Sequence, residues 1–319
     1  MSTEKHSSVD MSVNIAGVEW KNPVTVASGT FGSGEEFSKF VDLNKLGAVT
    51  TKGVANVPWA GNPTPRVAEV YGGMMNAIGL QNPGIDLFCE RDIPFLKKYD
   101  TKIIVNVCGH APEEYLAVVE RLADEPIDMM EINISCPNVN AGFLAFGQDA
   151  RHVEELTGQI KKLAKQPVIM KLTPNVTDVT EIARAAEAGG ADAVSLINTL
   201  TGMKIDINRK TFALANKTGG VSGPIVKPFF FIYASIPSMT FSVVAGSWKF
   251  AVPTDTALAP ANRNSIASSA QEMPPIPMIG MLTANFHDPA TTLKVIDGIE
   301  AYMKKNGFAH VSDMVGIVK

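Results

Sequence analysis

A cysteine at the end of a predicted strand is the residue of this chain best suited to acid–base chemistry. Apolar residues with interleaved polar ones run from Ile127 to Ile134 and predict a buried strand. The octet from Glu131 to Asn138 contains the end of this strand, followed by Cys136 and Pro137. Pro cannot continue a central strand, so the thiol stands where a strand gives way to a loop. In parallel α/β folds, ligands bind at that carboxyl end. The alternative is a small buried hydrophobe, the common role of a free cysteine, and position alone leaves both open.

Polar side chains also stand at or near the carboxyl ends of the other predicted strands. They are Ser28, Lys52, Asn106, Asn133, Lys171 and Asn198. In a closed barrel these ends converge on one mouth, so amides and ammonium groups from distant positions would face one ligand. A single Lys at a strand end is more often a solvated rim residue, but two Lys and three Asn at equivalent points favour a site. The set suits a flat, electron-rich ligand with many hydrogen-bond acceptors.

The elements that must position these side chains are short strand-like runs, each followed by a segment of helical period. Six runs predict strands: Pro23–Ser28, Ala48–Lys52, Lys102–Val107, Met129–Ser135, Val168–Leu172 and Ala193–Asn198. Apolar spacing predicts helices after the third, fourth and fifth of them, over 115–122, 153–163 and 179–186. Before the last helix, Asp178 and Glu181 are spaced as a capping box, and Gly189-Gly190 provides its stop.

This alternation of strands and helices predicts a parallel sheet with helices outside it. Six units by residue 200 favour an eight-unit (β/α)8 TIM barrel over an open sheet. A dinucleotide-binding Rossmann start would carry GxGxxG after its first strand, and Gly29-Thr30-Phe31-Gly32-Ser33-Gly34 does not have that spacing. The predicted fold class is therefore the α/β barrel.

Composition narrows the class of protein and its partners. The 319 residues are 45% hydrophobic and 19% charged, with a net charge of -4, as in an ordinary soluble enzyme. The balance is slightly acidic without a long basic cluster, so neither nucleic acid nor a membrane is expected as a partner. Three cysteines lie far apart, which predicts no metal site, no disulfide framework and a cytoplasmic location. Residues 1–11 are expected to form a disordered leader before one domain over 12–319.

Several motifs, taken together, resemble one enzyme family. In chain order they are Ala27-Ser28-Gly29-Thr30-Phe31-Gly32, Thr51-Lys52-Gly53, Gly61-Asn62-Pro63-Thr64-Pro65-Arg66, Asn76-Ala77-Ile78-Gly79-Leu80-Gln81-Asn82-Pro83-Gly84, the octet ending Cys136-Pro137-Asn138, Met170-Lys171-Leu172-Thr173-Pro174-Asn175, Ile197-Asn198-Thr199 and Gly219-Gly220-Val221-Ser222-Gly223-Pro224. From about residue 12 to 228 the chain resembles the class 1 dihydroorotate dehydrogenases, FMN-binding TIM barrels of pyrimidine (UMP) biosynthesis. The form Asn-Ala-Ile-Gly-Leu-Gln-Asn is similar to subclass 1B, in which a homodimer passes electrons to NAD through a subunit carrying FAD and an iron–sulfur cluster.

The resemblance implies a role for individual residues. Cys136 would be the base that removes the C5 proton of dihydroorotate, while hydride leaves C6 for N5 of FMN. The substrate would contact Lys52, Asn76, Ala77, Ile78, Gly79, Leu80, Asn133, Asn198 and Thr199. FMN would contact Ser28, Lys52, Gly53, Asn106, Asn133, Lys171, Ile197, Gly223 and Thr283. A thiol with a pKa of about 8.5 accepts a proton if its surroundings assist, and a Lys near the flavin would stabilise arriving negative charge.

The resemblance is lost over about 229–282. Phe229-Phe230-Phe231-Ile232-Tyr233 begins a stretch rich in Ser, Pro and Ala, and the Gly-Gly pair that the family uses for the FMN phosphate is absent. A compensated frameshift or a divergent insertion would each explain it, and the lost period favours the frameshift. A membrane helix over 229–248 is disfavoured by its Pro, Gly and Ser/Thr residues. The last barrel units are therefore expected to be aberrant.

Two alternatives to this function remain open from the sequence. One is a related FMN barrel that acts on another dihydropyrimidine. The other is an inactive barrel, damaged at its FMN-phosphate site.

Overall fold

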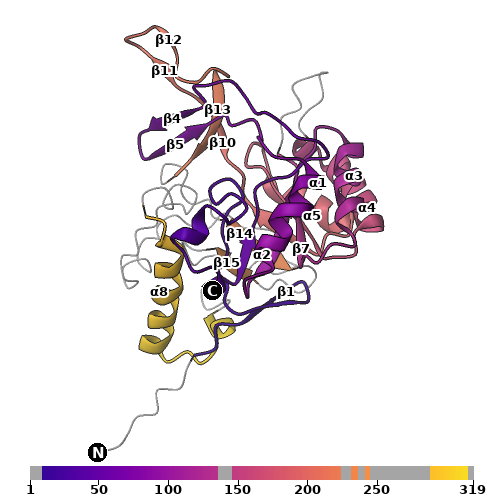
Figure 1. Ribbon diagram of the computed structural model, residues 1–319, viewed down its shortest axis with the longest axis vertical. Helices are drawn as coiled ribbons and strands as arrows, with labels where there is room; N and C mark the ends of the chain where they lie inside the picture. The colour runs from indigo at the N-terminus through magenta and orange to yellow at the C-terminus, as the bar shows by residue number, and fades with distance from the viewer. Residues whose placement is uncertain (1–8, 136–145, 224–230, 236–240, 245–287, 315–319) are drawn as a thin grey trace, which may run out of the picture.

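The centre of the molecule is a curled sheet, of which β7, β14 and β15 are labelled in Figure 1. The computed structural model describes residues 9–135, 146–223, 231–235, 241–244 and 288–314. The sheet has seven strands in the order β15-β14-β9-β8-β7-β6-β3. Five of them are neighbours in parallel: β3 (Ala48–Thr50), β6 (Lys102–Val107), β7 (Met129–Asn133), β8 (Val168–Lys171) and β9 (Ala193–Leu196). Five of the six predicted strands are thus confirmed. The first, Pro23–Ser28, is present only as an isolated parallel bridge from Thr25 to Ala48 at the edge of the sheet.

The strands that follow β9 depart from the parallel order. β14 (Phe231–Ser235) runs antiparallel to β9, and β15 (Phe241–Val244) runs antiparallel to β14. Both strands form within 229–282, the stretch rich in Ser, Pro and Ala in which the period of strands and helices is lost from the sequence. In the described part of the intervening chain there are strands rather than a crossover helix, and a parallel return needs a crossover. Residues 224–230, 236–240 and 245–287 lie outside the described part, and with them most of the segment expected to be aberrant.

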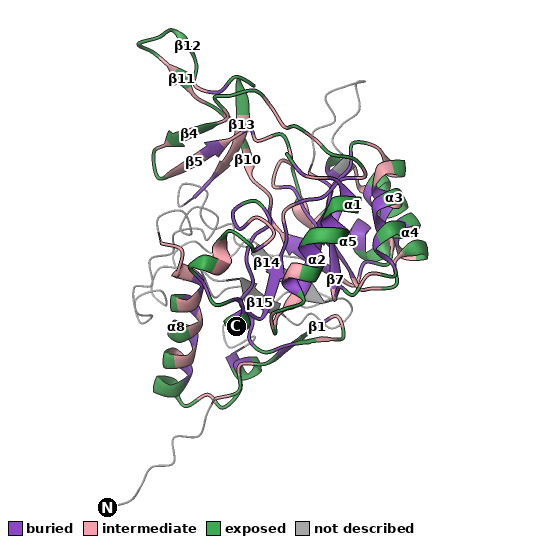
Figure 2. Cartoon of the chain, viewed as in Figure 1, coloured by how far each residue is buried: buried purple, intermediate pink, exposed green. Residues whose placement is uncertain are grey.

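The three predicted helices cover the outer face of the sheet. They are α3 (Pro112–Leu122), α4 (Ala150–Leu163) and α5 (Val179–Ala188), and the apolar residues predicted to face inward are largely buried. Asp178 caps α5 by accepting from the backbone N–H of Thr180 at 2.8 Å, and Asp149 caps α4 through His152. A further helical segment joins α1 (Ile85–Leu87), the π-helical η3 (Phe88–Asp92) and α2 (Ile93–Leu96). Figure 2 shows exposed residues on the outer sides of these helices.

The amino ends of the strands are closed by the two ends of the described chain. A hairpin of β1 (Val13–Ile15) and β2 (Val18–Trp20) packs there with α8 (Thr291–Asn306) and the 3-10 helix η7 (Val311–Met314). Trp20 and Met303 lie in one buried cluster with the first residues of several strands. The backbone N–H of Asp10 donates to Ala309 at 2.8 Å, so order begins inside the expected leader.

A small antiparallel sheet stands over the carboxyl ends of the barrel strands (Figure 1). Its order is β10 (Leu200–Met203), β13 (Thr218–Ser222), β5 (Gly73–Asn76) and β4 (Val67–Val70), and the hairpin of β11 (Ile205–Asp206) and β12 (Thr211–Phe212) extends beyond it. Short 3-10 turns complete the described elements: η1 (Phe37–Lys39), η2 (Leu43–Lys45) and η4 (Phe146–Gln148). No described helix is long and apolar enough to cross a membrane.

Candidate active site

The alternation of side chains along the parallel strands builds the site in layers. Near the amino ends, Ala48, Ile104, Met129, Ile169 and Ala193 pack in the inner apolar cluster. Two residues further along each strand, on the same inward face, stand Thr50, Asn106, Glu131, Lys171 and Ser195. All five of these polar side chains are buried. The interior therefore changes from apolar to polar toward the mouth.

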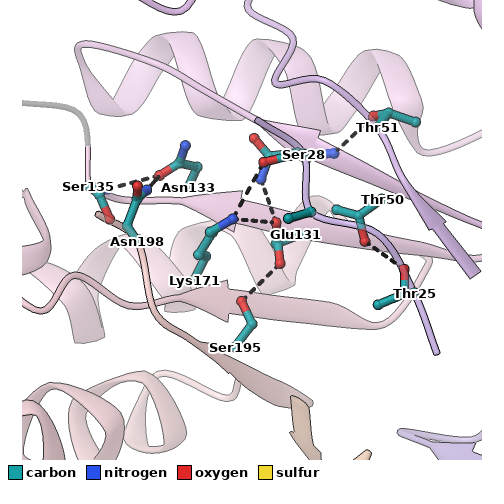
Figure 3. A network of polar contacts seen from close by, with 12 residues as sticks. Thr25, Ser28, Thr50, Thr51, Glu131, Asn133, Ser135, Lys171, Ser195 and Asn198 are labelled. Atoms are coloured by element: carbon teal, nitrogen blue, oxygen red, sulfur yellow. Dashed lines mark hydrogen bonds and ion pairs between the residues drawn. The ribbon is translucent and has the colours of Figure 1, made fainter. Parts of the chain in front are cut away.

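Glu131 is the hub of this polar layer (Figure 3). Its side chain is 0% exposed. Asn106 Nδ2 donates to Oε1 at 2.6 Å, and Ser195 Oγ donates to Oε2 at 2.9 Å. Lys171 Nζ lies 3.4 Å from Oε1 and 3.4 Å from Ser28 Oγ. One buried carboxylate thus joins two residues expected to contact the cofactor, and its ion-pair partner Lys171 reaches a third.

A second layer of amides lies one step nearer the mouth. Asn198 Nδ2 donates to Asn133 Oδ1 at 2.9 Å, and Asn133 Nδ2 lies 3.7 Å from Cys108 Sγ. The thiol of Cys108 in turn lies 3.4 Å from Asn106 Oδ1. Tyr115 OH donates to the backbone carbonyl of Asn133 at 2.8 Å. These contacts define where the oxygen and the nitrogen of each amide group lie. A ligand whose donors and acceptors have fixed positions requires such defined orientations.

Lys52 and Gly53 follow β3 at the same mouth. Burial lowers the pKa of the half-buried Lys52; a negative charge on Cys108 would oppose this effect, and the charges of Lys171 and Arg66 add to it. A Cβ at Gly53 would lie 2.4 Å from Cys108 Sγ and 2.8 Å from Asn106 Oδ1. Gly53 therefore lets the backbone pass directly beside these two side chains.

The segment 76–80 approaches the mouth from the small sheet. Asn76 pairs with Gly220 across β5 and β13, and its Nδ2 lies 3.4 Å from the carbonyl of Gly220. Asn62 holds the segment by donating from Nδ2 to the carbonyl of Ala77 at 3.0 Å and from its backbone N–H to the carbonyl of Ile78. Gly79 has a φ of +73°, and a Cβ there would lie 2.7 Å from Asn62. Leu80 follows with a φ of 50°.

The remaining expected residues sit where β9 leads into the small sheet. Ile197 is buried, and Thr199 donates its backbone N–H to Asn198 Oδ1 at 2.9 Å. A Cβ at Gly223 would lie 2.6 Å from Gly73 Cα, and its φ is +119°. Hydrogen bonds or close contacts thus join Ser28, Gly53, Asn106, Asn133, Lys171, Asn198 and Thr199, with Lys52 electrostatically coupled to Lys171. Cys136 and Thr283 lie outside the described residues.

Sequence reasoning missed Glu131, Ser195 and Cys108 as parts of the site. A Glu between Met130 and Ile132, inside a strand predicted to be buried, was the available indication, because a buried carboxylate needs partners. Ser195 and Cys108 offered no comparable indication. Small residues in apolar strands are common, and only the neighbouring strands show what they contact.

The curled parallel sheet, with Lys and Asn side chains at its carboxyl ends, makes this an α/β barrel protein with a ligand site at the mouth. The chain matches the family model described as dihydroorotate dehydrogenase over residues 10–233 and belongs to that family. It is 56% identical to the dihydroorotate dehydrogenase B (NAD(+)) catalytic subunit of Lachnoclostridium phytofermentans, over 98% of this chain and 100% of that one. The subunit of the same name from Alkaliphilus metalliredigens is 51% identical, over 97% and 98%.

A solved structure also shares this fold. The crystal structure of DHODH from Eimeria tenella in complex with ferulenol superposes with a TM-score of 0.54 at 21% identity. The match covers 71% of this chain and 68% of that one. At this identity the likeness concerns the fold alone.

Proposed function

We propose that this chain oxidises dihydroorotate to orotate in pyrimidine biosynthesis, as the FMN-binding catalytic subunit of an NAD-linked, B-type enzyme. The observation that carries the proposal is the convergence of Lys52, Lys171 and three Asn side chains at one end of the parallel sheet. Similarity to B-type catalytic subunits along nearly the whole chain supports the same substrate and acceptor. Members of the family act on this substrate by name.

The donors at the mouth fit FMN. Gly53 lets the backbone pass directly beside Asn106, one of the side chains expected to contact the ring. Ser28, Asn106 and Lys171 would hold the ring, with Asn133, Ile197, Gly223 and Thr283 completing the proposed contacts. When bound, FMN accepts hydride from the substrate. The ammonium groups of Lys52 and Lys171 favour the negative charge that arrives with it.

The second layer suits the substrate. Dihydroorotate carries a carboxylate, which Lys52 would pair, and imide groups, which need both donors and acceptors. Asn133 and Asn198 are held in defined orientations by their mutual hydrogen bond of 2.9 Å. Asn76, Thr199 and the segment from Ala77 through Ile78 and Gly79 to Leu80 would cover the other side. We assign Cys136 as the base that takes the C5 proton, since a thiol titrates near neutrality.

The chain is proposed to act with a second subunit. The two relatives are named as catalytic subunits, which supports a partner. We assign FAD and an iron–sulfur cluster to that partner and propose a homodimer of this chain, one barrel domain over 12–319 and a cytoplasmic location. Among the described residues, no group of three or more His, Cys, Asp or Glu side chains is placed to hold a metal.

The experiment that tests this function is anaerobic reduction of the purified chain. After rapid mixing, dihydroorotate should reduce the bound flavin and so abolish its visible absorbance, and dihydrouracil should not. Cys136→Ala should keep the flavin but slow its reduction by about 10²–10⁴-fold, as expected for loss of a general base. Faster bleaching by dihydrouracil, or a Cys136→Ala variant that reacts at the parent rate, would contradict the proposal.

A further inference from the structure

We infer that Glu131 is a positioning residue that holds Lys171 and Asn106 for the binding of FMN and that, by balancing the charge of Lys171, sets the reduction potential of the flavin. The inference rests on the proposed FMN site. It concerns a side chain for which neither the resemblance nor the strand-end pattern predicted a role. The three residues lie on adjacent strands, β6, β7 and β8.

The first step is the geometry of the carboxylate. Glu131 is fully buried, and its two oxygens receive donors from three different strands: Asn106 at 2.6 Å, Ser195 at 2.9 Å and Lys171 at 3.4 Å. A buried carboxylate is stable only with such partners. Register explains the contacts, because Asn106 lies directly opposite Glu131 in the β6–β7 ladder. Glu131 is therefore rigidly held by the sheet.

The second step is what Glu131 does to its neighbours. Asn106 gives its Nδ2 to Glu131 while its Oδ1 lies 3.4 Å from the thiol of Cys108, so its amide has one orientation. Lys171 Nζ lies between Glu131 and Ser28, 3.4 Å from each. Both groups are thus fixed at the place where the ring of FMN is proposed to bind. Without Glu131, the buried ammonium of Lys171 would lose this charge partner.

The third step is electrostatic. The pair of Lys171 and Glu131 is neutral overall, and the charge of Lys171 is close enough to lower the pKa of Lys52. Replacing Glu131 by Gln would keep the shape and one acceptor oxygen, for Asn106, while its Nε2 could donate to the hydroxyl of Ser195. It would remove one negative charge. The negative charge of Glu131 would then no longer offset the two ammonium groups at the flavin. Reduction adds negative charge to the ring, so the reduced form should be stabilised and the potential should rise.

The test compares two variants of the purified, flavin-loaded chain by equilibration with reference dyes. Glu131→Gln should bind reduced FMN more tightly relative to oxidised FMN by about tenfold or more, which is about 30 mV in a two-electron potential. Ser195→Ala is the matched control, because it removes a hydrogen bond to the same carboxylate without changing charge. Its potential should equal that of the parent. A parent-like potential in flavin-loaded Glu131→Gln would overturn the inference.

A second variant keeps the test decisive if Glu131→Gln does not accumulate. Glu131→Asp retains the charge but withdraws the carboxylate by one methylene from Lys171 and Asn106. FMN should then bind at least about fivefold more weakly, with the potential held near the parent value. An unchanged FMN affinity would refute the positioning role. A parent chain that binds no FMN would instead defeat the proposed function, so the two failures can be told apart.

Discussion

At the scale of single residues, the mouth of the barrel works by placing charges where water is scarce. Lys52 loses part of its hydration, and the charge of Lys171 lies close enough to affect it. Lys171 is buried but paired with Glu131, so the attraction between the two charges offsets part of the cost of burying them. The two lysines thus have different environments. Lys52 is suited to meet an anionic ligand, and Lys171 to meet a ring that gains charge.

Lys52 should make the binding of orotate depend on pH. Its folded-state pKa is lowered from the ordinary 10.5, so the ammonium loses its proton at a lower pH than a solvated lysine does. Orotate affinity should be highest below that pKa and fall up to about tenfold per pH unit above it. Lys52→Arg, which stays charged, should give a flat profile whatever its absolute affinity.

The measurement is an orotate titration followed by flavin absorbance, made in a Cys136→Ala background so that the thiol does not contribute. If the orotate affinity of the Cys136→Ala chain with Lys52 intact stays constant up to pH 10.5, Lys52 does not pair with the carboxylate.

Gly53 should tolerate no side chain. Ala at this position would place its Cβ 2.4 Å from Cys108 Sγ and 2.8 Å from Asn106 Oδ1, so one or both must move. We expect a stability loss of about 1–3 kcal/mol and a clear fall in flavin affinity. Unfolding in urea and flavin titration check both effects.

Gly158→Ala is the matched control for this prediction. It lies in α4, where the nearest atom to a new Cβ is 3.8 Å away. It should be neutral or stabilising by up to about 1 kcal/mol. Equal behaviour of the two variants would show that Gly53 is not sterically required.

At the scale of elements, each end of the parallel strands has its own task. The carboxyl ends present the polar layers, and the amino ends are closed by the β1–β2 hairpin with α8 and η7. This closure is apolar and contains Trp20 and Met303, both almost fully buried. Stability and chemistry are therefore carried by opposite ends of one sheet, as the barrel fold allows.

Shortening a buried side chain in this closure should reduce stability without changing the spectrum or the midpoint potential of the flavin. Met303 is 0% exposed in the inner cluster, so Met303→Ala should cost about 2–5 kcal/mol. Lys305→Ala, on the exposed side of the same helix, should stay within about 0.5 kcal/mol of the parent. Chemical denaturation gives both values. A flavin spectrum or midpoint potential that changes in Met303→Ala would show that the two ends are coupled.

At the scale of the whole molecule, the chain is proposed to bind one flavin and to pass electrons to NAD through a partner subunit. No GxGxxG follows its first strand, and its three cysteines are too widely spaced for an iron–sulfur relay. The relatives are named as catalytic subunits of NAD-linked enzymes. The proposed partner would supply the missing acceptor path.

The isolated chain should therefore reduce an artificial dye with dihydroorotate but should not reduce NAD. Adding the electron-transfer subunit should restore NAD reduction. Steady-state rates with the dye and with NAD, with and without the partner, measure this directly. Robust NAD reduction by the pure single chain would contradict the proposed division of labour.

Local periodicity was enough to find the five parallel strands, three outer helices and most polar residues at the mouth. A strand such as Met129–Asn133 can be predicted from its own residues, and so can the helix cap at Asp178. The small sheet was not predicted, because strands such as β4 and β10 are half-buried or exposed and contain no run of apolar residues. The direction of β14 was not predicted either, since one strand sequence pairs in either direction and the path of the connection decides.

The sequence by itself determined that lysines and asparagines end the parallel strands, because a strand's period and its stop are local properties. The tertiary structure alone decided that Glu131 receives Asn106, Lys171 and Ser195, and that Gly53 passes beside Cys108. The physical reason is that these contacts join strands far apart in the chain. They depend on register and curvature, which only the packed sheet defines.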